Sequence, residues 1–144
     1  MKKLFLLFIA VLVFVGCGGG DSDEAYERTP TDIDLTVLSV TMVSAQAFQM
    51  RVSPEDFLGQ TVRIRGSHYT FPWDEAGMDV HYVVLDLTAG CCGEAFEFIL
   101  TDELIESVGY PPHGAIIEVV GVFSSYEMFG LEFHYLYAFE INVE

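Results

Sequence analysis

The stretch Leu131-Glu132-Phe133-His134-Tyr135-Leu136-Tyr137-Ala138-Phe139-Glu140-Ile141-Asn142-Val143 decides the fold class of this chain. Apolar residues stand at every odd position, and polar residues stand at most of the even positions between them. Such alternation is the period-two pattern of a β-strand with one face on the core. The stretch therefore predicts a long strand whose odd-numbered side chains are buried.

Upstream of this stretch, turn signals separate further segments with strand-like patterns, at residues 61–69, 80–87, 95–100 and 115–123. Gly90 and Gly93 mark a hairpin loop between the second and third of them. In the third segment, Phe96 and Phe98 face one way and Glu97 faces the other. The chain is therefore expected to contain five strands.

Helical signals occur on either side of these segments. Residues 35–50 are predicted to form a helix after Asp34 as N-cap, because apolar residues recur there at spacings of three and four: Leu35, Leu38, Met42, Ala45 and Phe48. Interspersed valines leave a strand over part of this stretch open, because β-branched residues lose rotamer freedom in helices. A short turn is expected at residues 53–59, and a short helix between Thr101 and Gly109.

Five strands with one helix between the third and the fourth is the order of an OB-fold. The predicted fold class is therefore mainly β: a five-stranded OB-fold-like Greek-key barrel with an N-terminal helix and a short helix between strands three and four. An open antiparallel sandwich of the same strands is the alternative, because strand count alone does not separate the two.

The first residues have the features of an export signal. Two lysines are followed by an apolar run over residues 4–15 and then by Gly16 and Cys17, which is the order found in a signal peptide. The run is too short to span a bilayer, which takes about 20 apolar residues. We therefore expect residues 1–16 to be a leader that is removed from the mature chain.

Residues 14–17 resemble the lipobox of bacterial lipoproteins, with Phe14 where leucine is commoner. The resemblance implies cleavage before Cys17, a diacylglyceryl lipid on that cysteine, and a membrane-anchored, extracytoplasmic location in the cell envelope. Two acyl chains give lasting attachment. The alternative is an ordinary secretory signal that ends near Gly16, followed by an incidental cysteine.

The rest of the chain divides into a tether and one domain. Residues 18–24 are glycines followed by polar residues, the composition of a flexible linker. We expect residues 17–32 to form a lipidated flexible tether and residues 33–144 to form an OB-like β domain with an N-terminal helix. This length supports a single core rather than two.

The expected mature chain is strongly acidic. It keeps Arg28, Arg51, Arg63 and Arg65 against 22 acidic residues, and losing the two leader lysines takes its formal net charge from −16 to −18. Nucleic-acid binding depends largely on Lys and Arg that neutralise phosphates. We therefore expect no nucleic-acid partner, and solubility alone would account for the charge.

Several short motifs also resemble a family. Residues 34–36, 38–39 and 41–43, the Pro-Glu-Asp-Phe-Leu-Gly-Gln-Thr-Val motif at 54–62, Cys91-Cys92 and Glu97-Phe98 are similar to small, functionally uncharacterised bacterial lipoproteins with an OB-like domain. The likeness covers most of the chain from Asp34 onward and implies the fold but no activity. The paired cysteines alone are similar to the extracytoplasmic part of a bacterial family associated with zinc handling.

Cys91 and Cys92 are the most unusual local feature. Thiolates favour zinc or copper(I), and a zinc site takes about four ligands. His81, in the preceding expected strand, is the candidate third ligand, and other conceivable contributors are His68, Asp86 and Glu94. Thiophilic metal binding or homeostasis is therefore the alternative function. A vicinal disulfide or two packed thiols are the structural alternatives for the pair.

Aromatic residues gather in two expected loops. One loop follows the first strand and the other joins the fourth and fifth strands, and in OB-folds both lie beside the usual ligand face. Exposed aromatic side chains there would bind a peptide, a glycan or an envelope protein. The alternative is that they close the barrel ends as core. The candidates are Tyr69, Phe71, Trp73, Tyr126 and Phe129.

The sequence contains none of the common hydrolase or metalloprotease motifs. Its carboxylate pairs fit a loop rim and the first turn of a helix. We therefore expect no catalytic residues and no obligatory cofactor, and we expect a non-catalytic binding or interaction module.

Overall fold

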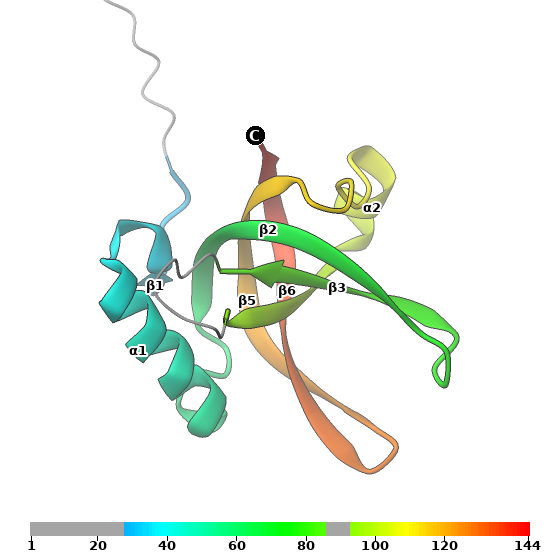
Figure 1. Ribbon diagram of the computed structural model, residues 1–144, viewed down its shortest axis with the longest axis horizontal. Coiled ribbons are helices and arrows are strands. Elements are labelled where there is room, and N and C mark those ends of the chain that lie inside the picture. Colours follow the sequence, from blue (N-terminus) through cyan, green and yellow to red (C-terminus); the bar gives the residue numbers. More distant parts are fainter. Residues whose placement is uncertain (1–27, 86–92) are drawn as a thin grey trace, which may run out of the picture.

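One sheet, hydrogen-bonded as a ring of strands, forms the centre of the fold (Figure 1). The computed structural model describes residues 28–85 and 93–144. The strand order is β1-β2-β3-β4-β6-β5, and β2 also pairs with β5. The elements are β1 (Ile33–Asp34), η1 (Leu35–Val37), α1 (Val40–Val52), η2 (Pro54–Asp56), β2 (Thr61–Trp73), β3 (Met78–Val84), β4 (Ala95–Leu100), α2 (Asp102–Ser107), β5 (Ile116–Met128) and β6 (Leu131–Val143).

The mainly β prediction is confirmed, and β4 and β6 have the predicted bounds. Two strands are longer than predicted, because β2 continues to Trp73 and β5 continues to Met128. Both extensions belong to hairpin arms whose aromatic and polar residues look like loops in the sequence. The sheet also gains β1, a two-residue strand that pairs in parallel with β2.

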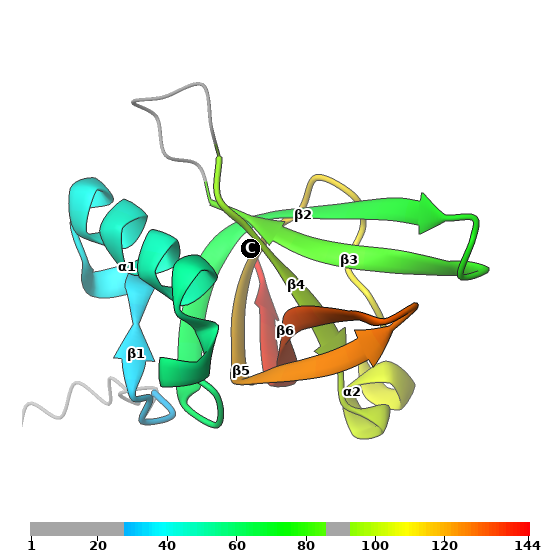
Figure 2. The ribbon, with the colours of Figure 1, turned by 90° about the horizontal axis from the view of Figure 1, so that it is seen from below.

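β2 is the strand that the two sides of the sheet share. Residues 61–67 pair with β5, and residues 67–73 pair with β3. Between these halves, a Cβ added at Gly66 would lie 2.2 Å from the carbonyl oxygen of Val84, so only glycine allows this close approach. Figure 2 shows the result: the β2–β3 and β5–β6 hairpins project to the same side, away from α1.

α1 covers the other end of the sheet. Its buried residues Val43, Ala47 and Met50 join the strand residues in one core cluster. The helix begins later than predicted, because Asp34 caps the short turn η1 and Ser39 caps α1. α2 follows Thr101 as expected. In the part of the chain that the structure describes, every helix is too short or too polar to cross a bilayer.

The buried face of β6 differs from the prediction. Leu136 and Ala138 are fully buried, whereas Tyr137 is 42% exposed and Phe139 is 40% exposed. The register with β5 shifts beside Phe139, and beyond this bulge Ile141 packs against the core. The prediction was wrong because it assigned every large apolar side chain to the core, whereas these aromatic side chains form a second face.

The segment before β1 is fastened to the sheet. Asp32 donates its backbone N–H to the carbonyl oxygen of Thr61 at 3.0 Å, and its carboxylate accepts from the Thr61 N–H at 2.8 Å. The fully buried Arg63 donates to the carbonyl oxygen of Thr29 at 2.7 Å and to Glu118 at 2.5 Å. Residues 28–32, which the sequence assigns to the tether, therefore lie against the sheet.

Candidate functional site

The tips of the two hairpins bring together aromatic side chains from distant parts of the sequence. The ring centroid of Trp73, at the end of β2, lies 5.5 Å from that of Phe133 and 5.9 Å from that of Phe129. Tyr126 stacks on Phe133 at 5.4 Å. We call these four residues the tip surface. Phe129 is 68% exposed and the other three are partly exposed, so aromatic side chains are accessible to solvent here.

The turn that carries Phe129 has an unfavourable backbone conformation. Phe129 has a φ of 54° and Gly130 a φ of 74°, and they join Met128 to its cross-strand partner Leu131. Positive φ at both central residues is typical of a type I′ turn, where Asn, Asp and Gly are preferred. Phe129 therefore holds a conformation that is costly for a bulky side chain while it stays mostly exposed.

A buried carboxylate adjoins the tip surface. Glu97 on β4 is 6% exposed, and its two carboxylate oxygens share the single proton that the Tyr126 hydroxyl donates, at 3.0 and 3.2 Å. The strand register places Tyr82 and Tyr135 directly beside it. Burial raises the pKa of Glu97, and the hydrogen bond from Tyr126 opposes this rise. Burial, followed by the contact with Glu97, raises the pKa of Tyr126, so its hydroxyl stays a donor.

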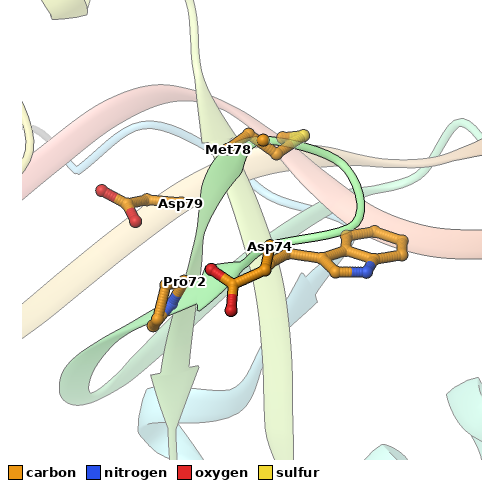
Figure 3. Close-up of a pocket in the computed structure, with 6 residues that line it drawn as sticks. Pro72, Asp74, Met78 and Asp79 are labelled. Carbon is orange, nitrogen blue, oxygen red and sulfur yellow. The ribbon is translucent and has the colours of Figure 1, made fainter.

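A hollow of about 250 Å³ lies at the β2–β3 tip (Figure 3). The turn beneath it is held by the carbonyl oxygen of Trp73, which accepts from the N–H groups of Ala76 at 3.1 Å and Gly77 at 2.9 Å. Figure 3 shows the carboxylates of Asp74 and Asp79 near Pro72. The hollow is lined by Pro72, Trp73, Asp74, Gly77, Met78 and Asp79.

The β5–β6 tip has a second hollow, of about 370 Å³, lined by Ser125, Tyr126, Glu127, Gly130 and Glu132. Glu127 and Glu132 are direct cross-strand neighbours, and like charges in this position destabilise a sheet. A histidine nitrogen, Nε2 of His134, lies 3.9 Å from Glu132. Each tip therefore combines an aromatic side chain with two carboxylates.

The aromatic residues expected in loops lie mostly on strands. Phe71 and Trp73 belong to β2, and Tyr126 belongs to β5, so the loop prediction was wrong for these three residues, whereas Tyr69 lies in β2 as the predicted strand over residues 61–69 has it. The arms stay paired up to tight turns, which leaves only Phe129 in a turn. The structure brings Trp73, Tyr126 and Phe129 together, while Tyr69 and Phe71 stack on each other at 6.3 Å farther from the tips.

Two residues of the site, Phe133 and Glu97, were not predicted to belong to it. Phe133 was assigned to the buried face of its strand, although it contacts both Trp73 and Tyr126. Glu97 was noted only as the side chain that faces away from its apolar neighbours. A single polar residue in an apolar strand was the signal that could have found it, because a buried carboxylate is costly without hydrogen-bond partners.

His81, the expected third metal ligand, belongs to a histidine pair inside the fold. Its Nδ1 lies 3.1 Å from Nε2 of the fully buried His68, and the hydroxyl oxygen of Thr70 lies 3.3 Å from both nitrogens. Burial lowers the pKa of His81, charge on His68 lowers it further, and Asp79 opposes the shift. These contacts favour an uncharged imidazole.

Cys17, Cys91 and Cys92 lie outside the described residues, so the lipid and metal-site predictions stay predictions. Within residues 28–85 and 93–144, no group of three or more His, Cys, Asp or Glu side chains is arranged to hold a metal ion. The tip surface and its hollows bring aromatic side chains and carboxylates together, an arrangement that can hold a partner by apolar contact and by charge. A scan against protein-family models gave no match to this chain, and a search of curated proteins found no similar sequence.

Proposed function

We propose that this chain is a membrane-anchored, extracytoplasmic lipoprotein that acts as a non-catalytic binding module, and that the tip surface contacts its partner. The observation that carries the proposal is the meeting of Trp73 and Phe129 from two separate hairpins, with Phe129 left mostly exposed. Aromatic side chains at the surface contribute a large share of the binding energy at protein interfaces. A peptide, a glycan and an envelope protein are the partner classes considered for this surface.

An OB-fold-like barrel would also favour the tip surface as the binding site. We propose an OB-fold-like barrel, because β2 to β6 follow each other in that order with α2 between β4 and β5, and because β2 pairs with β5. In OB-folds, the turns after the first strand and between the fourth and fifth strands flank the ligand face. The turns of the two hairpins occupy these positions.

The place where the described chain begins also supports the proposal. Figure 1 shows the first described residues on the α1 side of the molecule, away from both hairpin tips. A lipid on Cys17 would attach the protein through this side, which leaves the tips free for a partner. Mass spectrometry of the protein from membranes should find a diacylglyceryl group on Cys17, and Cys17→Ala should release the protein from the membrane fraction.

Partner capture tests the binding function. Chemical cross-linking in intact envelopes should capture the same partners with the wild-type chain and with Phe139→Ala, which removes an exposed aromatic side chain outside the tip surface. Trp73→Ala and Phe129→Ala should lose these partners while they keep the wild-type circular dichroism spectrum. Capture that is unaffected by both tip substitutions in folded protein would show that the tip surface is not the binding site.

A further inference from the structure

We propose that the partner of the tip surface is cationic, an extended peptide segment whose arginine or lysine side chains enter the two hollows. This inference rests on the proposed binding function and adds the chemistry of the partner. It is carried by three observations: the separation of charge along the chain, the composition of the two hollows, and the unfavourable pairing of Glu127 with Glu132.

Positive charge is confined to one part of the chain. All six lysine and arginine residues precede Gly66, whereas 14 of the 22 acidic residues follow it. Each arginine lies within ion-pair distance of an acidic side chain: Arg28 of Asp34, Arg51 of Glu94, Arg63 of Glu118, and Arg65 of Glu144. The hairpin arms therefore have no lysine or arginine of their own to balance their carboxylates.

Each hollow is lined by one aromatic residue and two acidic residues. The first places Asp74 and Asp79 beside Trp73, and the second places Glu127 and Glu132 beside Tyr126. A cation is attracted both by the face of an aromatic ring and by a carboxylate, and guanidinium groups can stack on the first while they hydrogen-bond to the second. Neither a neutral glycan nor an anionic headgroup would compensate these charges.

The pairing of Glu127 with Glu132 provides an independent argument. These carboxylates are direct neighbours across β5 and β6, and this pairing costs stability in the unbound protein. His134 lies 3.9 Å from Glu132 and is the only basic side chain within ion-pair distance of either residue in the described part of the chain. A bound cation would remove the repulsion, so the free energy that the pair costs the free protein is recovered in the complex.

The single tryptophan allows a direct test. Trp73 is the only tryptophan of the chain, so its fluorescence reports on the tip surface. The purified full chain in a neutral detergent is titrated with a five-residue peptide of alternating arginine and serine, and with the same peptide carrying glutamine in place of arginine. The arginine peptide should change the Trp73 emission saturably and more weakly at high salt, whereas the glutamine peptide should not.

Paired variants separate local recognition from net charge. Glu127→Gln with Glu132→Gln should weaken binding of the arginine peptide about tenfold, as expected for the loss of two exposed charge contacts. Glu55→Gln with Asp56→Asn removes the same charge from η2, at the opposite end of β2 from Trp73, and should change binding less than about twofold. Thermal unfolding shows that each variant is folded before it is titrated.

Three results would overturn the inference: no saturable effect of the arginine peptide, equal binding of the glutamine peptide, or equal losses in the two variant pairs. A neutral oligosaccharide that binds through Trp73 would overturn it as well. In each case the binding function stands as long as partner capture depends on Trp73. If capture does not depend on Trp73, the proposed function fails whatever the peptide does.

Discussion

The two halves of β2 differ in their charged side chains and in the ion pairs that these make. In residues 61–67, Arg63 is buried against Glu118 and Arg65 pairs with Glu144. In residues 67–73, the strand has no arginine or lysine and ends in the aromatic residues of an open tip. One continuous strand thus supplies both an ion-paired part of the central sheet and one arm of the proposed binding surface.

Gly66→Ala should disturb both halves of β2, because Gly66 lies where they join. The new Cβ would lie 2.2 Å from the carbonyl oxygen of Val84, so β3 would have to move away from β2. We expect a loss of about 3 kcal/mol or more in the free energy of unfolding, measured in urea at fixed pH. The control is Gly93→Ala, whose added Cβ has its nearest neighbours at 3.4 Å. Equal losses in the two variants would contradict the steric explanation.

Arg63→Met tests the first half of β2 alone. It removes the cation that lies between Asp34, Glu118 and Glu140, all of them partly buried. We expect a loss of about 2–3 kcal/mol in the free energy of unfolding, because these carboxylates lose their buried cation, while Arg28 stays within ion-pair distance of Asp34 and Glu118. The matched control, Arg65→Met, removes an exposed pair and should cost at most about 1 kcal/mol. Trp73 emission should be unchanged in both variants, and a large change would show that the two halves are coupled.

Phe129→Asn tests the turn of the β5–β6 hairpin, which contacts the end of β2 through Trp73. Asparagine tolerates the positive φ of this position, so the turn should gain about 1 kcal/mol, less the lost ring contact with Trp73. We therefore expect a modest rise in melting temperature together with a loss of partner capture. A less stable variant with full capture would show that Phe129 serves packing.

The smallest expected effect is the pH dependence that His81 contributes. Its pKa is below the ordinary value of 6.5 in the folded chain, so its stabilising contribution is complete above pH 6.5 and is lost as the pH falls below it. Glu97 acts in the opposite sense, because its raised pKa gives a contribution that is complete below 4.5 and is lost as the pH rises through the folded value.

These two contributions can be separated with Glu97→Gln as the background. Urea unfolding of this variant at pH 8 and pH 5 should show lower stability at pH 5. Adding His81→Gln should reduce the difference between the two pH values. If the difference stays the same, groups other than His81 cause it.

Much of the fold was predictable because burial imposes a simple alternation on a strand. β4 was predicted with its observed bounds, since Phe96, Phe98 and Leu100 share one face. In β6 the bounds were correct and the buried face was wrong, because hydrophobicity does not distinguish a core position from an exposed aromatic one. Ala138 is buried while the larger Phe139 is partly exposed, which depends on the bulge that the sequence does not reveal.

The candidate site was predictable where aromatic residues stand near turn signals, which also identified Tyr126 although it lies in β5. Trp73 and Phe129 were found because aromatic residues next to turn signals are unusual. Glu97, Tyr82 and Phe133 were missed because they lie within strands, and their proximity depends on three strands and two arms that converge in space. Contacts of this kind depend on register and bending, and neither follows from local composition.

The attachment of the first described residues to β2 also has a mechanical consequence. A force that pulls Arg28 away from the sheet acts first on its ion pairs with Asp34 and Glu118, and then on the Thr29–Arg63 contact and the two Asp32–Thr61 hydrogen bonds. These must rupture before the paired strands bear tension. Under force applied at residue 28, these contacts would therefore break first, and the two hairpins would stay folded.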